Sequence, residues 1–468
     1  EIILNKILKL KYNYITSKKN GDLISSIFVS TQNAGATLEN LVILIKSLVY
    51  FIFYIIMAFI ISYKFTLFLL TLIFISYLII LPFLQKSKVL GEENKKITDE
   101  IISNLNNYLK GFKIIKTYNL INKIKNNLYL SFKSYSLNSI NIMKNKIFSF
   151  SFLEPLILLS IILMIIITYD LATFNLSSFM VILIIFTLLI PQLKSINSNM
   201  LQINELIPHY IKLQEILNLV NTDKFNYSLK KLSFKKIVFD NVKINNFGNN
   251  NFQLFINYSF FKNKTYAIVG PSGSGKTTII NLILKLCDPD EGNILIDQTQ
   301  LSQIPIDEWT NNISFVDQEN YLFNTTIKEN ISTVDSTYTD TKFKDVLNIA
   351  NINIEELDYN KLIGDNSANI SGGQRQRISF ARAIYKNSDL FILDEFTNEL
   401  DKKNENIINN YVQSLKGKKT IIIIGHKLDL IKFVDEIIFI KNGKIVCAGN
   451  HSDLLTHNKE YRNYFNEN

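Results

Sequence analysis

The stretch Gly270-Pro-Ser-Gly-Ser-Gly-Lys-Thr-Thr278 decides the fold of this chain of 468 residues. It follows an apolar run, residues 266–269, that predicts a β-strand, and it opens a segment, residues 278–285, that predicts a helix. The spacing G-x-x-x-x-G-K-[ST] is typical of a loop whose backbone N–H groups cradle phosphate oxygens at a helix N-terminus. A glycine-rich turn without function is the alternative, and the flanking strand and helix argue against it. The stretch therefore predicts a site for a nucleoside triphosphate.

The loop residues have separate predicted roles. Lys276 is placed to reach the β- and γ-phosphates, and the Thr277 hydroxyl is placed to hold Mg²⁺. The other nucleotide contacts that we expect within the loop are Gly270, Ser272, Gly273, Gly275 and Thr278.

The first half of the chain is more apolar than a soluble enzyme. Hydrophobic residues make up 47% of the sequence and charged residues only 19%, and the apolar excess lies before residue 200. Four apolar stretches, at residues 41–63, 65–84, 148–169 and 174–190, have the length of about 20 residues that a helix needs to cross the hydrocarbon. They also lack a polar face. We therefore expect four transmembrane spans arranged as two hairpins.

The distribution of lysine orients these spans. The net charge of +9 by itself would fit nucleic-acid binding, but the lysines gather beside the apolar spans, above all in residues 85–146. The positive-inside rule places that segment in the cytoplasm, whereas the turn at residues 170–173 carries no Lys or Arg and should face outward. We expect a protein of the lipid bilayer with no nucleic-acid partner.

Glu154 interrupts the third span. A carboxylate within a membrane span indicates a functional site by default. This one is expected near the cytoplasmic end of its span, where water reaches it, so a substrate contact, a solvated side chain and a helix kink at Pro155 all stay open.

The sequence pattern changes after residue 220. Residues 221–231 are typical of a linker, and from residue 232 onward short β-rich runs alternate with helices, as in an α/β domain. The fold class that we expect is multidomain: an all-α transmembrane helical domain at residues 1–220, then an α/β P-loop NTPase domain at residues 232–468.

A second apolar run ends in two carboxylates, Asp394 and Glu395. At the end of a strand beside a phosphate loop, Asp394 would hold Mg²⁺ and its waters. Glu395 would then act as the general base that polarises the attacking water. An ordinary solvated strand end is the alternative, but a buried strand rarely ends in paired acids for packing alone, because unpaired buried charge is costly.

Residues 370–377 read Ile-Ser-Gly-Gly-Gln-Arg-Gln-Arg. Glycines that follow Ser371 at a helix start would expose N–H groups and form another anion site. One chain does not need a second phosphate loop within the same site, so we expect this segment to contact a nucleotide bound to a partner subunit. The predicted contacts are Ser371, Gly372, Gly373 and Gln374.

The order of these motifs resembles the ABC transporter ATPase, and the spans ahead of it resemble the transmembrane domain of an exporter. The resemblance covers essentially the whole chain. It implies that Gln318 contacts Mg²⁺ and couples to the membrane domain, and that Asp401 belongs to a loop crossing to the partner's site. It also implies that His426 contacts the γ-phosphate.

The sequence departs from the family pattern near the nucleotide base. Asn246 stands where a stacking tyrosine is usual, so we expect Phe247 to stack on adenine. Asn398 and Glu399 replace the commoner Ser-Ala before Asp401. Residues 20–23 and 111–117 are similar to parts of the two cytoplasmic loops of such exporters. On that match, the first two of six helices would precede Glu1.

The resemblance implies an ATP-driven half-transporter that exports or flips a lipid, a lipid-linked sugar, a drug or a peptide. It would hydrolyse ATP with Mg²⁺ at the interface of a dimer, which we expect to be a homodimer. We expect it in a bacterial inner membrane, with the ATP-binding domain in the cytoplasm. A regulatory or channel-like ABC protein is the first alternative, and the intact Glu395 and His426 argue against it. A soluble ABC ATPase acting on ribosomes or DNA is the second, and the four spans argue against it.

Overall fold

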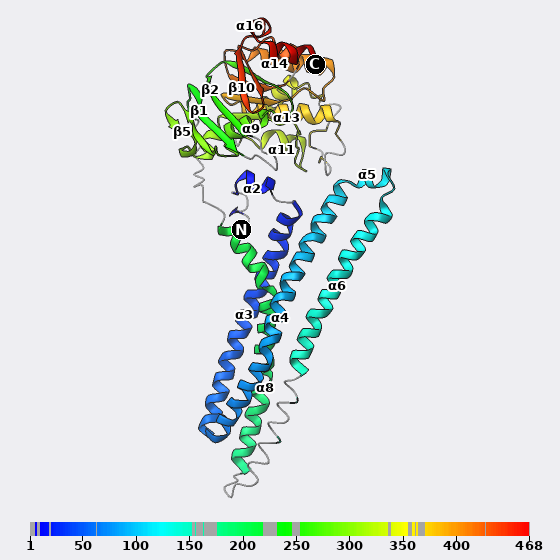
Figure 1. The fold of residues 1–468 in the computed structure, drawn as a ribbon, viewed down its shortest axis with the longest axis vertical. Helices are drawn as coiled ribbons and strands as arrows, with labels where there is room; N and C mark the ends of the chain where they lie inside the picture. The colour runs from blue at the N-terminus through cyan, green and yellow to red at the C-terminus, as the bar shows by residue number, and fades with distance from the viewer. Residues whose placement is uncertain are drawn as a thin grey trace. The chain divides into compact units, whose positions relative to one another are not determined.

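The computed structural model describes residues 5–6, 10–17, 20–61, 63–151, 155, 162, 176–218, 232–245, 253–335, 338–353, 358–360, 362–363, 370–425 and 427–467. The chain divides into two compact units, Glu1–Asn221 and Thr222–Asn468. Figure 1 draws both, and each unit is described by itself.

The first unit is built from long helices. Its described helices are α2 (Tyr12–Ser17), α3 (Asn20–Ile61), α4 (Tyr63–Lys110), α5 (Phe112–Thr117), α6 (Ile121–Ser151) and α8 (Leu176–Asn218). The longest of them run side by side (Figure 1): α3 packs against α4 and α8, and α4 packs against α6. The unit is therefore an all-α bundle, as the sequence predicts.

Among the described residues, two helical segments are long and apolar enough to cross a membrane, Gly21–Ile61 and Ile73–Lys110. The first predicted hairpin falls on α3 and α4, although α3 already ends at Ile61 and α4 begins at Tyr63. The third predicted span lies largely outside the described residues, as does Glu154. The fourth falls on α8 from Leu176 onward, and α8 continues through Pro191 and Pro208 without ending.

Buried polar side chains join α4 to α6 and α8. Asn138 and Asn145 of α6 donate from Nδ2 to the carbonyls of Leu90 and Phe83, at 3.1 and 2.9 Å. Ser87 of α4 donates from Oγ to the Leu201 carbonyl at 2.8 Å. Such contacts fix the register of helices that have little hydrophobic driving force to associate within lipid.

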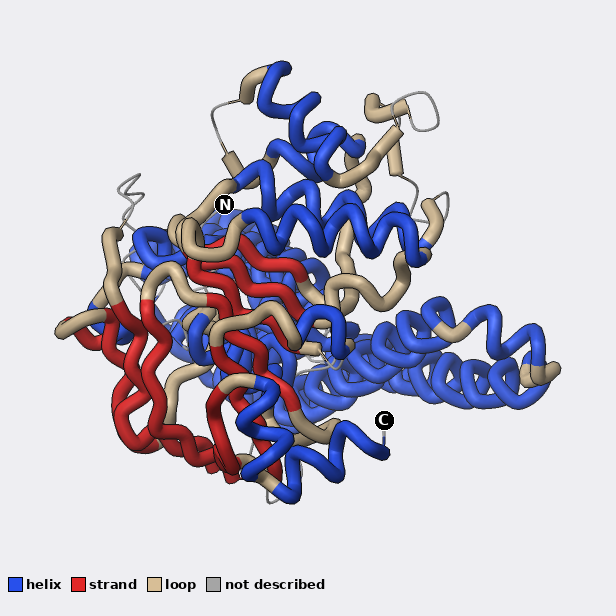
Figure 2. Tube along the Cα trace, turned by 90° about the horizontal axis from the view of Figure 1, so that it is seen from above, coloured by secondary structure: helices blue, strands red, loops and turns tan. Residues whose placement is uncertain are grey.

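The described part of the second unit contains one ten-stranded sheet in the order β5-β4-β1-β2-β10-β9-β3-β8-β7-β6, seen in Figure 2 as the strands drawn in red. Strands β9, β3, β8, β7 and β6 are parallel neighbours, whereas β1 pairs antiparallel with β2 and β4, and β9 pairs antiparallel with β10. The sheet is therefore mixed. Its strands are β1 (Lys236–Asn245), β2 (Gln253–Phe261), β3 (Thr265–Val269), β4 (Glu291–Ile296), β5 (Thr299–Gln300), β6 (Ile313–Val316), β7 (Leu390–Asp394), β8 (Thr420–Ile424), β9 (Glu436–Lys441) and β10 (Lys444–Gly449).

Helices pack against this sheet. They are α9 (Lys276–Ile283), α10 (Ile306–Thr310), α11 (Ile327–Ser332), α12 (Asp340–Ile349), α13 (Gly372–Lys386), α14 (Lys402–Ser414), α15 (Leu428–Ile431), α16 (His451–His457) and α17 (Lys459–Glu467), with a 3-10 turn, η1 (Leu301–Gln303). Strands β3, β7 and β8 are buried at every residue. Continuous apolar runs of this kind are typical of parallel strands covered on both faces.

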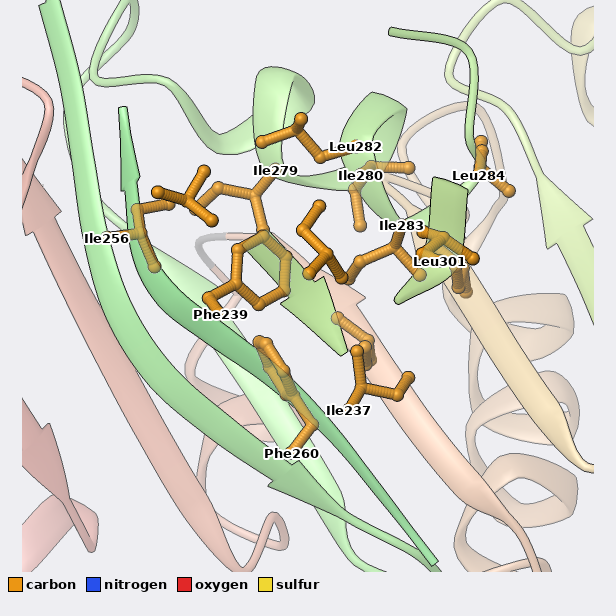
Figure 3. Close-up of a cluster of buried hydrophobic side chains, with 14 of the residues drawn as sticks. Ile237, Phe239, Ile256, Phe260, Ile279, Ile280, Leu282, Ile283, Leu284 and Leu301 are labelled. Atoms are coloured by element: carbon orange, nitrogen blue, oxygen red, sulfur yellow. The ribbon is translucent and has the colours of Figure 1, made fainter. Parts of the chain in front are cut away.

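Helix α9 is anchored by the main core cluster, which Figure 3 shows. Its side chains Ile279, Ile280 and Ile283 face Ile237 and Phe239 of β1 and Ile256 and Phe260 of β2. The Trp309 indole also donates to the Ile283 carbonyl at 2.6 Å. Because α9 starts directly after the predicted phosphate loop, this packing fixes the end of that loop.

Candidate nucleotide site

The segments that carry Gly270, Gln318 and Asp394 lie at one edge of the parallel part of the sheet. Strands β3, β8, β7 and β6 lie side by side, and the register pairs Ile424 with both Ile268 and Asp394, and Val316 with Leu393. The segments that follow the carboxyl ends of all four strands therefore meet. In open α/β sheets this edge is where ligands bind.

The glycines of the loop are required by its backbone. Gly270, Gly273 and Gly275 have φ values of 153°, 75° and 103°, which side chains rarely tolerate. A Cβ on Gly270 would lie 2.0 Å from the carbonyl oxygen of Ile440. Gly275 is the left-handed residue that precedes α9, so the helix begins at Lys276 rather than at the predicted Thr278.

Lys276 folds back over its own loop. Its Nζ donates to the carbonyls of Gly270 and Pro271 at 2.7 and 2.9 Å. Burial lowers the pKa of Lys276, while the nearby carboxylates of Glu395 and Asp394 raise it. Along the same loop Ser272 and Thr277 are exposed, whereas Thr278 is buried.

Asp394 and Glu395 point into different surroundings because the backbone turns between them. Asp394 ends β7 with 3% of its surface exposed. Glu395 adopts a left-handed φ of 45° and donates its N–H to the Ile424 carbonyl at 3.0 Å. Burial, with added repulsion from Glu395 and Asp317, raises the pKa of Asp394 to about 7, against the lowering effect of Lys276.

The Glu395 carboxylate is held by two amide donors at the same oxygen. Gln318 donates from Nε2 to Oε2 at 2.9 Å, and Asn398 donates from Nδ2 at 2.8 Å. The structure thus brings together the predicted Glu395 and Gln318. The contact of Asn398 with Glu395 does not follow from the motifs, and its one signal in the sequence is that Asn398 replaces the commoner serine.

The oxygen donors near the loop fit a magnesium ion. The Thr277 hydroxyl, the Gln318 amide oxygen and the Asp394 carboxylate are hard ligands of the type that Mg²⁺ takes alongside phosphate and water. Since Gln318 contacts Glu395 through Nε2, its oxygen is not used in that hydrogen bond.

Ser371 lies at the start of a helix, as predicted. It is the N-cap of α13: its hydroxyl accepts from the Gln374 N–H at 3.3 Å, and its own N–H donates to Gln374 Oε1 at 2.9 Å. A Cβ on Gly372 would lie 2.5 Å from Glu399 Oε2 and one on Gly373 would lie 3.1 Å from the Glu399 carbonyl. Among the described residues, no hydrogen bond or ion pair joins segment 371–374 to the loop at 270–278.

Hydrogen bonds hold the loop between Glu395 and α14 near both of its ends. Asp401 is the exposed N-cap of α14 and accepts from the Asn404 N–H at 3.3 Å. Lys427 donates to the Thr397 carbonyl at 3.0 Å and to Glu405 Oε1 at 2.7 Å. No short pattern in the sequence indicates the ion pair between Lys427 and Glu405. His426, Asn246 and Phe247 lie outside the described residues.

Two family models match separate parts of the chain. The model described as "ABC transporter transmembrane region" matches residues 2–194, and the model described as "ABC transporter" matches residues 255–398. Together they extend over most of the sequence, in the order membrane region and then ATP-binding domain.

Curated relatives match less than half of the chain. An ATP-dependent lipid A-core flippase of Saccharophagus degradans is 38% identical over 214 residues, which are 45% of this chain and 36% of that protein. A putative multidrug export ATP-binding/permease protein of Staphylococcus aureus is 38% identical over 215 residues, which are 45% of this chain and 37% of that protein. The aligned part thus spans little more than a third of either relative.

Among solved structures, that of a bacterial Atm1-family ABC exporter with ATP bound has the same fold. Its TM-score is 0.89 at 20% sequence identity, and the match covers 99% of this chain and 83% of that one. The two family models and this fold lead to one conclusion: the chain belongs to the ABC transporters, as a membrane protein whose helical transmembrane region is fused to an ATP-binding domain.

Proposed function

We propose that this chain is an exporter-type half-transporter that hydrolyses ATP to move an amphipathic substrate across a bacterial inner membrane. The observation that carries the proposal is the hydrogen bond between Gln318 and Glu395 at the sheet edge from which the glycine loop emerges. The loop can bind phosphate, the carboxylate can accept a proton, and the glutamine connects two neighbouring strand ends. Relatives named as lipid A-core flippases and a multidrug exporter support a lipid or drug over a peptide.

The residues of the loop are assigned to nucleotide binding. Lys276 would contact the β- and γ-phosphate oxygens, and N–H groups of residues 272–278 would surround them. Thr277, Gln318 and Asp394 would hold the magnesium ion. When bound, Mg²⁺ neutralises charge that develops on the transferred phosphoryl group.

Glu395 is assigned as the general base. Its two amide donors engage the same Oε2, so the other carboxylate oxygen is the one placed to accept the proton of a water molecule. Two further assignments, His426 to the γ-phosphate and Phe247 to the adenine ring, concern residues outside the described part of the chain. They rest on the sequence alone.

A second set of nucleotide contacts is assigned to a partner subunit. A second copy of this chain is sufficient as that partner. Ser371, Gly372, Gly373, Gln374 and Asp401 would contact the nucleotide held by the partner's loop. The first-turn N–H groups of α13 suit an anion. A regulatory or channel-like ABC protein is the alternative function, and it requires no general base.

The experiment that tests the proposal compares the full chain in liposomes with its Glu395→Gln variant. Glu395→Gln should lower the turnover of ATP by roughly 10²- to 10⁴-fold and should keep the affinity for ATP, because the amide replaces only the proton acceptor. Movement of a fluorescent phospholipid between leaflets should require ATP and should be lost in the variant. Near-normal hydrolysis by Glu395→Gln would rule out the assigned base, and hydrolysis without movement of any tested lipid or drug would favour the regulatory alternative.

A further inference from the structure

Two hydrogen-bond donors from distant parts of the chain meet at the backbone carbonyl of Gly270. Lys276 donates from Nζ at 2.7 Å, and the Tyr464 hydroxyl donates at 3.2 Å. Gly270 begins the glycine loop, whereas Tyr464 belongs to α17, near the carboxyl end of the chain. A helix far from the loop in sequence thus contacts the loop directly.

Tyr464 is held in this position by aromatic packing on strand β9. Its ring centroid lies 5.4 Å from that of Phe439 and 5.3 Å from that of Phe465. Phe439 pairs with Val269 in the register of β3 and β9. Because Val269 immediately precedes Gly270, the ring contacts fix the Tyr464 hydroxyl relative to the first residue of the loop.

Gly270 itself has little room to shift. Its φ of 153° and the 2.0 Å that would separate a Cβ from the Ile440 carbonyl oxygen show that its peptide is pressed against β9. The position of the Gly270 carbonyl is therefore set by the sheet. A donor that leaves this carbonyl has to be replaced by another group, because the carbonyl cannot easily turn toward a new partner.

We propose that Tyr464 is a positioning residue of the nucleotide site, which keeps the Gly270 carbonyl hydrogen-bonded when Lys276 turns to the phosphates. This inference rests on the proposed function. A bound nucleotide would draw the Lys276 ammonium away from the carbonyls of Gly270 and Pro271. Tyr464 then remains as a donor to Gly270, and it stabilises the nucleotide-bound form of the loop more than the free form.

The protonation state of Tyr464 suits this role. Burial raises the pKa of Tyr464 above its usual value, and the hydrogen bond to Gly270 only partly opposes this. The hydroxyl therefore keeps its proton at neutral pH and acts as a donor. In the free protein, loss of the Tyr464 hydroxyl is tolerated, because Lys276 still donates to the Gly270 carbonyl. In the nucleotide-bound protein, the same loss leaves that carbonyl without a donor, which is costly.

The test is the Tyr464→Phe variant of the full chain in detergent micelles, with MgATP and MgADP affinities measured by calorimetry. The phenylalanine keeps the ring packing and removes only the hydroxyl. A single neutral hydrogen bond predicts affinities weakened by about 2- to 10-fold for both nucleotides. In steady-state hydrolysis the KM for ATP should rise by a similar factor while kcat at saturating ATP changes little.

The matched control is Tyr461→Phe on the same helix. Tyr461 also packs on Phe439, at 5.7 Å between ring centroids, but its hydroxyl lies 2.8 Å from Nδ1 of His451 and away from the loop. Its removal should leave both nucleotide affinities unchanged. Thermal unfolding of the free proteins shows whether either variant loosens α17.

Each outcome decides the inference. Unchanged nucleotide affinities in Tyr464→Phe, or an equal weakening in Tyr461→Phe, would overturn it while leaving the proposed function intact. Lys276→Ala serves as the reference for the proposed function: if the unmodified chain and Lys276→Ala bind MgATP equally poorly, the proposed function itself fails and the inference fails with it.

Discussion

Asp394 shows how burial changes the chemistry of one residue. Its carboxyl group lies at the inner end of the site with Glu395 and Asp317 nearby, and its pKa is raised to about 7. Near neutral pH a large fraction of this group is protonated in the free protein. A bound magnesium ion would require the ionised form, so binding of MgATP should release protons.

The expected result is a release of several tenths of a proton per site when MgATP binds at pH 7, decreasing toward zero at pH 9. Calorimetric titrations in two buffers with different ionisation enthalpies measure it. Asp394→Asn should remove the magnesium-dependent part of this release. A release that is unchanged in Asp394→Asn would assign the protons to another group.

The same pKa has a consequence for the stability of the free protein. Because the folded pKa is raised above the ordinary value of 3.8, the folded state holds the proton more tightly than the unfolded state between about pH 4 and pH 7. The contribution of Asp394 to folding stability is therefore largest at low pH and is lost as the pH rises through this window.

Other residues of the site depend on tertiary contacts that no short pattern reveals. The sequence predicts Lys276, Asp394 and Glu395 because their chemistry follows from motif spacing. The amide donor Asn398 contacts Glu395, only three residues away, whereas the hydroxyl donor Tyr464 acts through a hydrogen bond to a group whose position is set by the fold. For Tyr464 the partner is 194 residues away, so local sequence carries no sign of it.

At the scale of elements, helix α14 and the loop before it are coupled to the segment after β8 by a partly buried ion pair. Glu405 of α14 has 7% of its side chain exposed and Lys427 has 30%, with 2.7 Å between Oε1 and Nζ. Lys427 also donates to the Thr397 carbonyl at 3.0 Å. The pair therefore connects the loop that carries Asn398 and Asp401 with the segment that carries His426.

Replacing Glu405 by Gln should destabilise the protein and loosen this loop. The loss of a hydrogen bond to a charged, mostly buried group predicts about 1.5–3 kcal/mol, measured as a lowered Tm of the full chain in detergent. Glu291→Gln is the matched control, since Glu291 pairs with Lys243 while both side chains are about half exposed; such a pair contributes about 0–1 kcal/mol. Equal shifts in the two variants would contradict a structural role for the Glu405–Lys427 pair.

The elements of the ATP-binding unit follow from the sequence to different degrees. The apolar runs before the loop and before Asp394 predict β3 and β7, because strands buried on both faces need continuous apolar residues. The antiparallel strands β1, β2 and β4 give a weaker signal, since each of them mixes buried and exposed residues. The α/β class that the sequence predicts is therefore confirmed, whereas the antiparallel pairing of β1 with β2 and β4 does not follow from the sequence.

At the scale of the whole molecule, hydropathy and the order of motifs predict the division into a membrane region and an ATP-binding domain, and the family models match both parts. The identity of the substrate does not follow from hydropathy or from the order of motifs, because the helices that are expected to line a transport path are apolar and aromatic. The buried polar side chains Asn138 and Asn145 join α6 to the backbone of α4, and they say nothing of the substrate.

The last prediction concerns the sharing of sites between two chains. Each chain has one glycine loop and one helix start at Ser371, and the described residues show no hydrogen bond between them. Ser371→Asp keeps an N-cap residue at α13, because aspartate caps as well as serine, and places a negative charge where the phosphate of the partner's nucleotide is expected. Lys276→Ala removes the ammonium group from the loop.

A mixed dimer of these two variants distinguishes the arrangements. If each chain completed its own site, both sites would be defective. If sites are shared, the loop of the Ser371→Asp chain meets the unaltered Ser371 of the other chain, and one site is intact. Nucleotide trapping in a purified, differently tagged mixed dimer of full-length chains should then reach about half the level of the unmodified dimer, on the order of one nucleotide per two sites. Trapping no greater than in either homodimeric variant would refute the shared arrangement, whereas trapping at one site with little hydrolysis would mean that the two sites must act together.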